Sequence, residues 1–474
     1  MSKLANQYKG TVARLSLEGL WCARGVRTSR NEQEAIKIGV TSAKKRGLAL
    51  SLNEMARAQA SLSNNKDALL NFEEALQIRR EIGDKRGLGD TLIDIGNFSN
   101  ERGDYDQALK TYKEALDLER DLSNEGMQAI CLNNIGTAYS EKGQYEDSLT
   151  YYQQALQLRE KAKVPQDIVE AIHNLGETYA DVGQYDKAIA YYLRALDLRR
   201  SMNDQRGAAI ESYGLGMLFA YQGRFGAAVN SEQEALKTFR NIQDKTAWMA
   251  QVLGGAAETL ILAGRGDEAK DYLDEARSLS RELKNDEMGA AALGFQGDGH
   301  FYSGDLKSAH ASYAEALQVA TRSKEPVFIL IAKANLAKVE LQEKRVQEAV
   351  SSLRQLVPQA DTLGLKYTSA ESSIFIAEGM MQSRDRAPAR QELERALLLS
   401  DKLGMQPLSA RAHYLLAVIA RQSGNASDAQ DHYREALRLL DVMKKDPGAE
   451  KLLQRSDFKA IYDESTHGIQ SPKS

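Results

Sequence analysis

Side chains that could carry out chemistry are few and scattered in this sequence of 474 residues. The two cysteines, Cys22 and Cys131, are too few for a disulfide framework or a four-ligand zinc site. The patterns HExxH, GxSxG and GxxxxGK followed by Ser or Thr are all absent. The histidines lie far apart, without a paired metal-binding spacing, at His173, His300, His310, His413, His432 and His467. We therefore expect no enzyme activity, no cofactor and no metal site.

One nucleotide-binding pattern does occur, because residues 264–269 read Gly-Arg-Gly-Asp-Glu-Ala and fit G-x-G-x-x-A. In dinucleotide-binding folds this pattern follows a strand, whereas here a helix is expected to end at Gly264. Gly264 and Ala269 also occupy positions that recur along the whole chain. A structural role therefore explains this match better than a nucleotide site.

The elements that must position any site follow a repeat of 40 residues. Alanines equivalent to Ala108 recur from Ala68 to Ala429 in steps of 40, with a single step of 41, and a second small-residue series follows seven residues later. Of the twenty positions, eighteen are alanine, and the exceptions are Ser148 and Leu356. Because seven residues make about two helical turns, both series lie on one helix face.

A third series of Gly or Ala, which includes Gly96 and Gly136, marks a partner helix in each repeat. Turn glycines such as Gly103 follow it, and Asp104 is expected to cap the next helix. Each repeat therefore predicts two helices joined by a tight turn, and no segment shows the alternation of a strand. A lone helix pair cannot bury both faces, so neighbouring pairs should stack into an all-α solenoid.

The best-conforming repeats carry a recognisable set of residues. Asn134, Gly136, Tyr139, Gly143 and Tyr152 return 40 residues later as Asn174, Gly176, Tyr179, Gly183 and Tyr192. This pattern resembles the tetratricopeptide repeat (TPR), in the long-helix class of kinesin light chains, Leu-Gly-Asn-repeat adaptors and bacterial signalling proteins. The resemblance implies a right-handed α-solenoid of about ten to eleven antiparallel helix pairs with a C-terminal capping helix.

The regularity of the repeats suggests boundaries along the chain. Residues 1–47 form a degenerate basic unit, residues 48–284 well-formed repeats and residues 285–443 diverged repeats, in which Lys344 and Arg384 replace turn glycines. Residues 444–463 are expected to form the capping helix, and residues 464–474 a disordered tail.

In TPR arrays the first helix of each repeat lines a concave groove, so the resemblance implies a peptide-binding surface. Asparagines such as Asn134 carry both a donor and an acceptor for an extended peptide backbone. The expected groove residues are Asp90, Asp94, Asn97, Asn100, Glu101, Asn133, Asn134, Thr137, Glu141, Glu170, His173, Asn174, Glu177 and Asp181. Because seven of them are acidic and none is Lys or Arg, a basic or polar ligand segment is favoured. The alternative is that these acids form an ordinary solvated face.

The charge of the chain is uneven. The first 47 residues hold ten Lys and Arg against three Asp and Glu, although the whole chain has a net charge of −4. This basic segment could contact the acidic groove of a second copy, which makes a homo-oligomer an alternative. Nucleic acid is a less favoured partner because no nucleic-acid motif occurs.

The sequence therefore predicts an interaction scaffold that binds a partner protein or an extended peptide, as an adaptor or regulatory component in signalling. A self-associating structural protein, or the sensor arm of a kinase or transcription regulator whose effector is on another chain, are the alternatives. The N-terminus lacks the apolar core of a secretory signal, and no apolar run approaches a membrane span. With only two cysteines, we expect a cytoplasmic protein without membrane contact.

Overall fold

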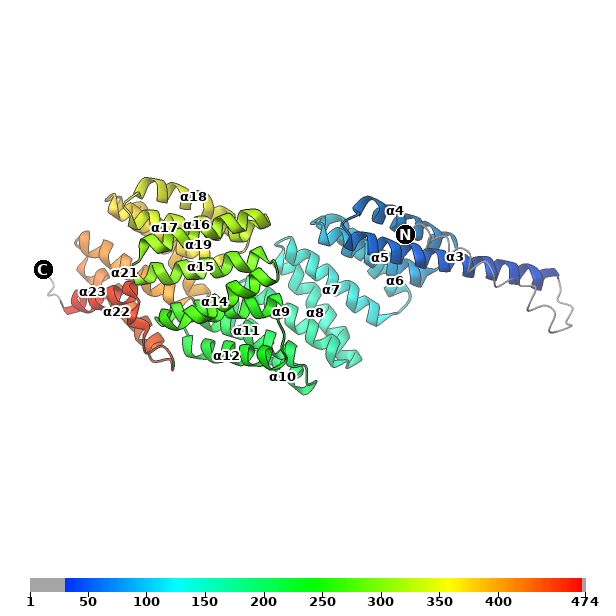
Figure 1. Ribbon diagram of the computed structural model, residues 1–474, viewed down its shortest axis with the longest axis horizontal. Helices are drawn as coiled ribbons and strands as arrows, with labels where there is room; N and C mark the ends of the chain where they lie inside the picture. The colour runs from blue at the N-terminus through cyan, green and yellow to red at the C-terminus, as the bar shows by residue number, and fades with distance from the viewer. Residues whose placement is uncertain (1–29, 471–474) are drawn as a thin grey trace. The chain divides into compact units, whose positions relative to one another are not determined.

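The computed structural model describes residues 30–470, and within this range all regular structure is helical. Within each of two parts of the chain, Figure 1 shows successive helices as antiparallel neighbours. The chain divides into two compact parts, Met1–Ala162 and Lys163–Ser474. We call them the N-terminal part and the C-terminal part. The all-α array of repeated helix pairs predicted from the sequence is confirmed.

The described residues of the N-terminal part form three helix pairs. Their helices are α3 (Arg30–Ser61), α4 (Asn65–Glu81), α5 (Lys85–Glu101), α6 (Tyr105–Asp121), α7 (Glu125–Glu141) and α8 (Tyr145–Ala162).

The C-terminal part contains seven further pairs, a 3-10 turn and a final helix. The first four pairs are α9 (Pro165–Asp181), α10 (Tyr185–Ser201), α11 (Gln205–Tyr221), α12 (Phe225–Asn241), α13 (Ala247–Leu262), α14 (Gly266–Glu282), α15 (Asp286–Ser303) and α16 (Leu306–Ser323). The remaining elements are α17 (Pro326–Gln342), α18 (Val346–Thr362), α19 (Lys366–Gln382), α20 (Arg386–Lys402), α21 (Gln406–Gln422), α22 (Ala426–Lys444), η1 (Leu452–Gln454) and α23 (Ser456–Gln470).

Helix contacts show which side of each array is the inner one. Every second helix packs against the first helix of its own pair, and successive first helices also touch, as in α3 with α5 and α5 with α7. The same holds in the C-terminal part from α11 to α21. Among residues 30–470, no contacts of similar extent join successive second helices. The odd-numbered helices therefore form an inner row, and the even-numbered helices an outer row.

Each turn between α3 and α22 contains one residue in the left-handed backbone region, and these turns recur about every 20 residues. Gly103 is typical, with φ +75°. Its N–H donates to the Asn100 carbonyl at 2.9 Å, and the Asp104 N–H donates to the Ser99 carbonyl at 2.9 Å. These bonds satisfy carbonyls at the helix end. The Asp104 carboxylate then accepts from the Gln107 N–H at 3.3 Å, which confirms the predicted cap.

The small-residue series has the packing role that the sequence suggested. A Cβ atom added to Gly96 would overlap the ring of Tyr112. Gly297 has the same relation to Tyr313, which is fully buried. Glycine at these positions lets a tyrosine ring of the second helix pack directly against the backbone of the first helix.

The 264–269 match has the predicted structural role. Helix α13 ends before Gly264, which has φ +78°, and α14 begins at Gly266. Cys131 is fully buried in the core of the N-terminal part, and burial raises the pKa of its thiol to about 12. Among residues 30–470, no helix combines the length and apolar character needed to cross a bilayer.

The C-terminal end departs from the expected cap and tail. Helix α23 begins at Ser456 and ends at Gln470, so residues 464–470, which we expected to be disordered, are helical. They are ordered because Gly468 lies against the Tyr433 ring of α22 and Tyr414 donates to Glu464 at 2.6 Å. The boundaries suggested at 47, 284 and 443 follow repeat regularity and stay predictions.

Candidate peptide-binding face

The predicted groove residues of the N-terminal part lie on α5 and α7, two helices of the inner row. Asp90, Asn97, Glu101 and Glu141 are exposed. The others are half-buried, namely Asp94, Asn100, Asn133, Asn134 and Thr137. None of the nine is fully buried in the packed core.

The amide side chains of this face bond to one another. Asn97 Oδ1 accepts from Tyr112 Oη at 2.7 Å and from Asn134 Nδ2 at 3.2 Å. Thr137 Oγ1 lies 2.9 Å from Tyr152 Oη in a hydroxyl–hydroxyl hydrogen bond. The tyrosines that pack on Gly96 and Gly136 therefore also orient the polar residue that follows each glycine. Since one Asn134 proton is used within the array, its amide has less capacity for a peptide than the sequence suggested.

Carboxylates add negative charge to the same face. Asp94 Oδ2 accepts from Asn53 Nδ2 at 2.6 Å, and Asp94 Oδ1 lies 4.0 Å from Arg57 Nε. Burial raises the pKa of Asp94 against the opposing effect of these two neighbours. The pKa of Asp90 is also raised, chiefly by burial.

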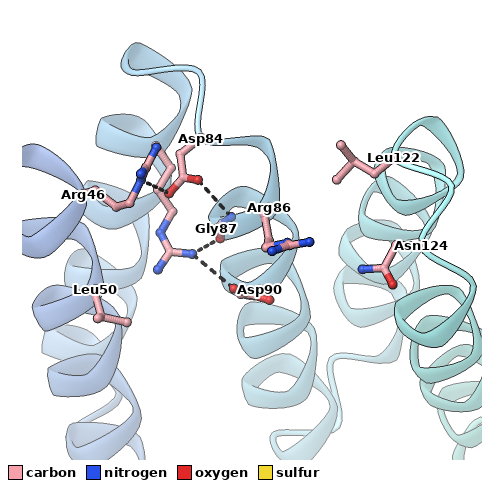
Figure 2. Close-up of a pocket in the computed structure, with 9 residues that line it drawn as sticks. Arg46, Leu50, Asp84, Arg86, Gly87, Asp90, Leu122 and Asn124 are labelled. Atoms are coloured by element: carbon pink, nitrogen blue, oxygen red, sulfur yellow. Dashed lines mark hydrogen bonds and ion pairs between the residues drawn. The ribbon is translucent and has the colours of Figure 1, made fainter. Parts of the chain in front are cut away.

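A basic pocket, which the sequence analysis missed, adjoins these acids in the N-terminal part. Figure 2 shows Arg46, Asp84, Arg86 and Asp90 around it, with Leu50 and Leu122 at its sides. Its volume is about 570 Å³. The Arg79 side chain is only 4% exposed, donates to the Gly87 carbonyl, and lies 4.0 Å from Asp90. Arginines on α3, α4 and α5 therefore offset part of the acidic charge at this end of the face. Arg46 and Arg86 each lie ten residues before a position of the third small-residue series. This shared spacing is a sequence signal for the pocket that could have been found.

The five predicted residues of the C-terminal part lie on α9. Glu170, Glu177 and Asp181 are exposed, whereas His173 and Asn174 are half-buried. His173 Nδ1 lies 3.0 Å from Glu211 Oε2, and His173 Nε2 lies 3.2 Å from Glu177 Oε1. Burial alone would lower the pKa of His173, but the two carboxylates outweigh it and raise the pKa to about 10. The imidazole is therefore a cation at neutral pH. It adds a positive charge to this face that a count of Lys and Arg alone did not include.

Buried charges line the inner row farther along the C-terminal part, and sequence reasoning missed them. Each buried cation there has a carboxylate partner and an aromatic ring. Lys338 Nζ lies 3.0 Å from Glu371 and 3.6 Å from Asp298, and 5.7 Å from the ring centre of Phe375. Arg411 donates to Glu378 at 2.8 Å, and its guanidinium lies 4.1 Å from the same ring centre.

The third buried cation comes from residues 446–458, which we call the strap. The Arg455 guanidinium lies 2.7 Å from Asp457 and 3.9 Å from the ring centre of Tyr302. It also donates to the Leu262 carbonyl at 3.3 Å. The sequence could not show this arrangement, because the contacts join residues more than 150 positions apart.

Other strap contacts join the last residues of the C-terminal part to its earlier helices α12 and α14. Asp446 accepts from the Gly226 N–H at the start of α12, where other second helices often carry their own acidic residue. A Cβ at Gly226 would overlap the Pro447 carbonyl. Lys451 pairs with Glu268 at 3.1 Å. The array of the C-terminal part therefore curves back until its end meets its earlier turns.

Within residues 30–470, no three His, Cys, Asp or Glu side chains are grouped so that they could hold a metal ion. His413 and His432 do meet, with 2.8 Å between their Nδ1 atoms, but no carboxylate or cysteine completes a ligand set. The inner helices carry amides and carboxylates, and the buried cations among them are paired with carboxylates.

Comparison with known families matches residues 122–405 to the MalT-like TPR region. The chain belongs to this family. Tetratricopeptide repeat families also match the MalT-like TPR chain at residues 91–125 and 380–449. A further match, at residues 37–102, is to anaphase-promoting complex subunit 5. The resemblance to TPR proteins inferred from the sequence is thus confirmed.

Solved structures similar to this MalT-like TPR chain include a Rap protein complexed with competence and sporulation factor. It is 14% identical, with a TM-score of 0.54, and the match covers 76% of this chain and 99% of that protein. Aspartyl phosphate phosphatase F from Bacillus subtilis is 13% identical, with a TM-score of 0.50, covering 67% and 80%. At such identities the likeness concerns the fold alone. Comparison with curated proteins gives no significant match.

Proposed function

We propose that this MalT-like TPR chain is a non-catalytic scaffold that binds an extended peptide or a partner protein along its inner row, as an adaptor or regulatory component in signalling. The observation that carries the proposal is the polar face of α5 and α7 in the N-terminal part and, separately, that of α9 in the C-terminal part. Their asparagines and carboxylates are half-buried or exposed, and none of them belongs to the packed core.

The chemistry of this face favours a basic or polar ligand segment. In the N-terminal part, Asp90, Asp94, Glu101 and Glu141 supply negative charge that complements lysine or arginine side chains. The similar Rap protein is itself found with competence and sporulation factor, which agrees with a fold able to hold a ligand.

Selection from a random peptide library displayed on phage tests this proposal. The baits are the wild-type protein, an inner-face variant carrying Asp94→Lys and Glu177→Lys, and a control with Asp117→Lys on outer helix α6. We expect wild type and control to enrich the same basic or polar peptides, and the inner-face variant to lose them. Identical peptides from all three baits would contradict binding at the inner row.

A further inference from the structure

One carboxylate in the interior of the C-terminal part lacks the partner that its neighbours have. Successive inner helices α13, α15, α17 and α19 place Glu258, Asp298, Lys338 and Glu378 at equivalent repeat positions, 40 residues apart. Asp298 pairs with Lys338 at 3.6 Å, and Glu378 pairs with Arg411 at 2.8 Å. Within residues 30–470, no hydrogen bond or ion pair is formed by Glu258, which is half-buried and therefore reached by solvent.

Two inner helices of this interior bring a pair of aromatic rings together. Tyr221 from α11 and Tyr367 from α19 stack with ring centres 5.4 Å apart and planes inclined by 23°. Burial, with the charge of Glu258 adding to it, raises the pKa of Tyr221, and Glu258 contributes in the same direction at Tyr213 and Tyr367. The Tyr213 ring lies against Gly255, one helical turn before Glu258, and Tyr221 lies on α11, an inner helix that contacts α13.

A second carboxylate behind Glu258 is also without a cation. Glu232 on α12 is 1% exposed, and its Oε1 accepts from Thr259 at 2.9 Å. Its Oε2 has no partner among the described residues. Thr259 directly follows Glu258 in α13. Three cations, Lys338, Arg411 and Arg455, form ion pairs with other acids of this interior, and within the described residues none of them forms an ion pair with Glu258 or Glu232.

We propose that Glu258 and the stacked rings of Tyr221 and Tyr367 form a subsite for a cationic side chain, arginine or lysine, of the bound partner. Each buried cation of this interior, Lys338, Arg411 and Arg455, lies near both a carboxylate and an aromatic ring. The proposed subsite would give a ligand cation the same two kinds of neighbour. The carboxylate and the rings are present here, and the cation is the missing member. The inference rests on the proposed function, since it specifies the chemistry of one part of the ligand.

The electrostatics of the site agree with this assignment. Burial, together with the charges of Asp298 and Glu371, raises the pKa of Glu258 to about 8, while Lys338 acts in the opposite direction. Burial and the charge of Glu258 raise the pKa of Glu232 to about 8, against the Thr259 hydrogen bond. An entering cation would favour the ionised form of Glu258, so binding at pH 7 should release a proton.

The direct test uses acetyl-Ala-Arg-Ala-amide as the probe and its citrulline analogue as the uncharged match. Binding is followed by saturation-transfer NMR on the full chain, and proton release by calorimetry in two buffers of different ionisation enthalpy. We expect the arginine probe to bind at least tenfold more tightly than the citrulline probe. Glu258→Gln should remove that difference, whereas Glu348→Gln on outer helix α18 should keep it. Equal binding of the two probes, or an unchanged preference in Glu258→Gln, would overturn the proposal.

A second test supplies the cation within the chain and needs no ligand. Met217 on α11 occupies the position equivalent to Glu258 one repeat earlier, and it is half-buried. Met217→Lys should raise the thermal midpoint and abolish binding of the arginine probe. Both effects should disappear when Glu258→Gln is added. A Met217→Lys effect that is the same with and without Glu258 would show that no cation site exists there.

The two proposals can fail separately. If phage selection yields peptides that depend on Asp94 and Glu177 but bind Glu258→Gln unchanged, the scaffold function stands and the cation subsite is wrong. If the arginine probe depends on Glu258 while the inner-face variant retains every selected peptide, the subsite stands and the wider groove is wrong.

Discussion

Replacing Glu232 by glutamine should change how stability depends on pH. This carboxylate is 1% exposed and has one hydrogen-bond partner, Thr259. It stands opposite Gly216, at the position where other repeats place a tyrosine against their glycine. Burial and nearby Glu258 raise its pKa from 4.5 to about 8. Glutamine keeps the shape and the acceptor but cannot ionise.

The sign and size follow from the two pKa values. Below pH 4.5 the group is protonated in both states, so it imposes no penalty. Between pH 4.5 and 8 the unfolded chain loses the proton first, so the free energy of unfolding falls as the pH rises. With a shift of roughly 3.5 units and about 1.4 kcal/mol per unit, the penalty approaches ~5 kcal/mol above pH 8 as an upper bound.

Urea unfolding at pH 5 and pH 9 measures this effect, with amide hydrogen exchange in α11 to α13 as a local readout. Glu232→Gln should be close to wild type at pH 5 and clearly more stable at pH 9. Glu234→Gln is the matched control, because Glu234 is exposed and forms a surface pair with Arg200 that should be worth little. A wild-type and a Glu232→Gln protein with the same pH dependence would refute the reasoning.

Three further outcomes are expected. Gly297→Ala should lower the free energy of unfolding by about 2 kcal/mol or more, because its Cβ would strike a buried tyrosine ring. Gly294→Ala in the same helix has free space and should raise the free energy of unfolding. The urea midpoints of the two variants test this difference. Lys344→Gly should stabilise by up to about 1 kcal/mol, since Lys344 has φ +69°, and an unchanged midpoint would count against strain in this turn. Arg455→Ala should release the strap and expose it to limited proteolysis, with Arg434→Ala, an exposed position, cleaved like wild type.

Repeat spacing predicted the local structure well because the local structure depends on near neighbours. The Asp104 cap, the turn at Gly103 and the small residues facing Tyr112 all involve residues at most about 16 positions apart. Lys344 and Arg384 adopt the left-handed conformation of the glycines they replace, so the repeat geometry overrides their local preference.

The candidate site was only partly predictable. The resemblance to TPR proteins implied that the first helix of each repeat faces inward, and the structure places Asp94, Asn134 and Asn174 on inner helices, half-buried. The resemblance could not show that Asn134 donates to Asn97, because that bond depends on the exact approach of α5 and α7. The curvature of the C-terminal part was equally hidden. No repeat signal indicates that α11 and α19 bring Tyr221 and Tyr367 together.

Photo-crosslinking from defined positions tests directly whether the inner helices contact the ligand. Benzoylphenylalanine is placed at Asn134 or Asn174 on the inner row, and at exposed Lys110 or Lys237 on the outer row. With a peptide obtained by phage selection, we expect covalent adducts from the inner positions and none from the outer positions. Adducts of equal yield from both rows, or from the outer row alone, would contradict recognition by the inner helices.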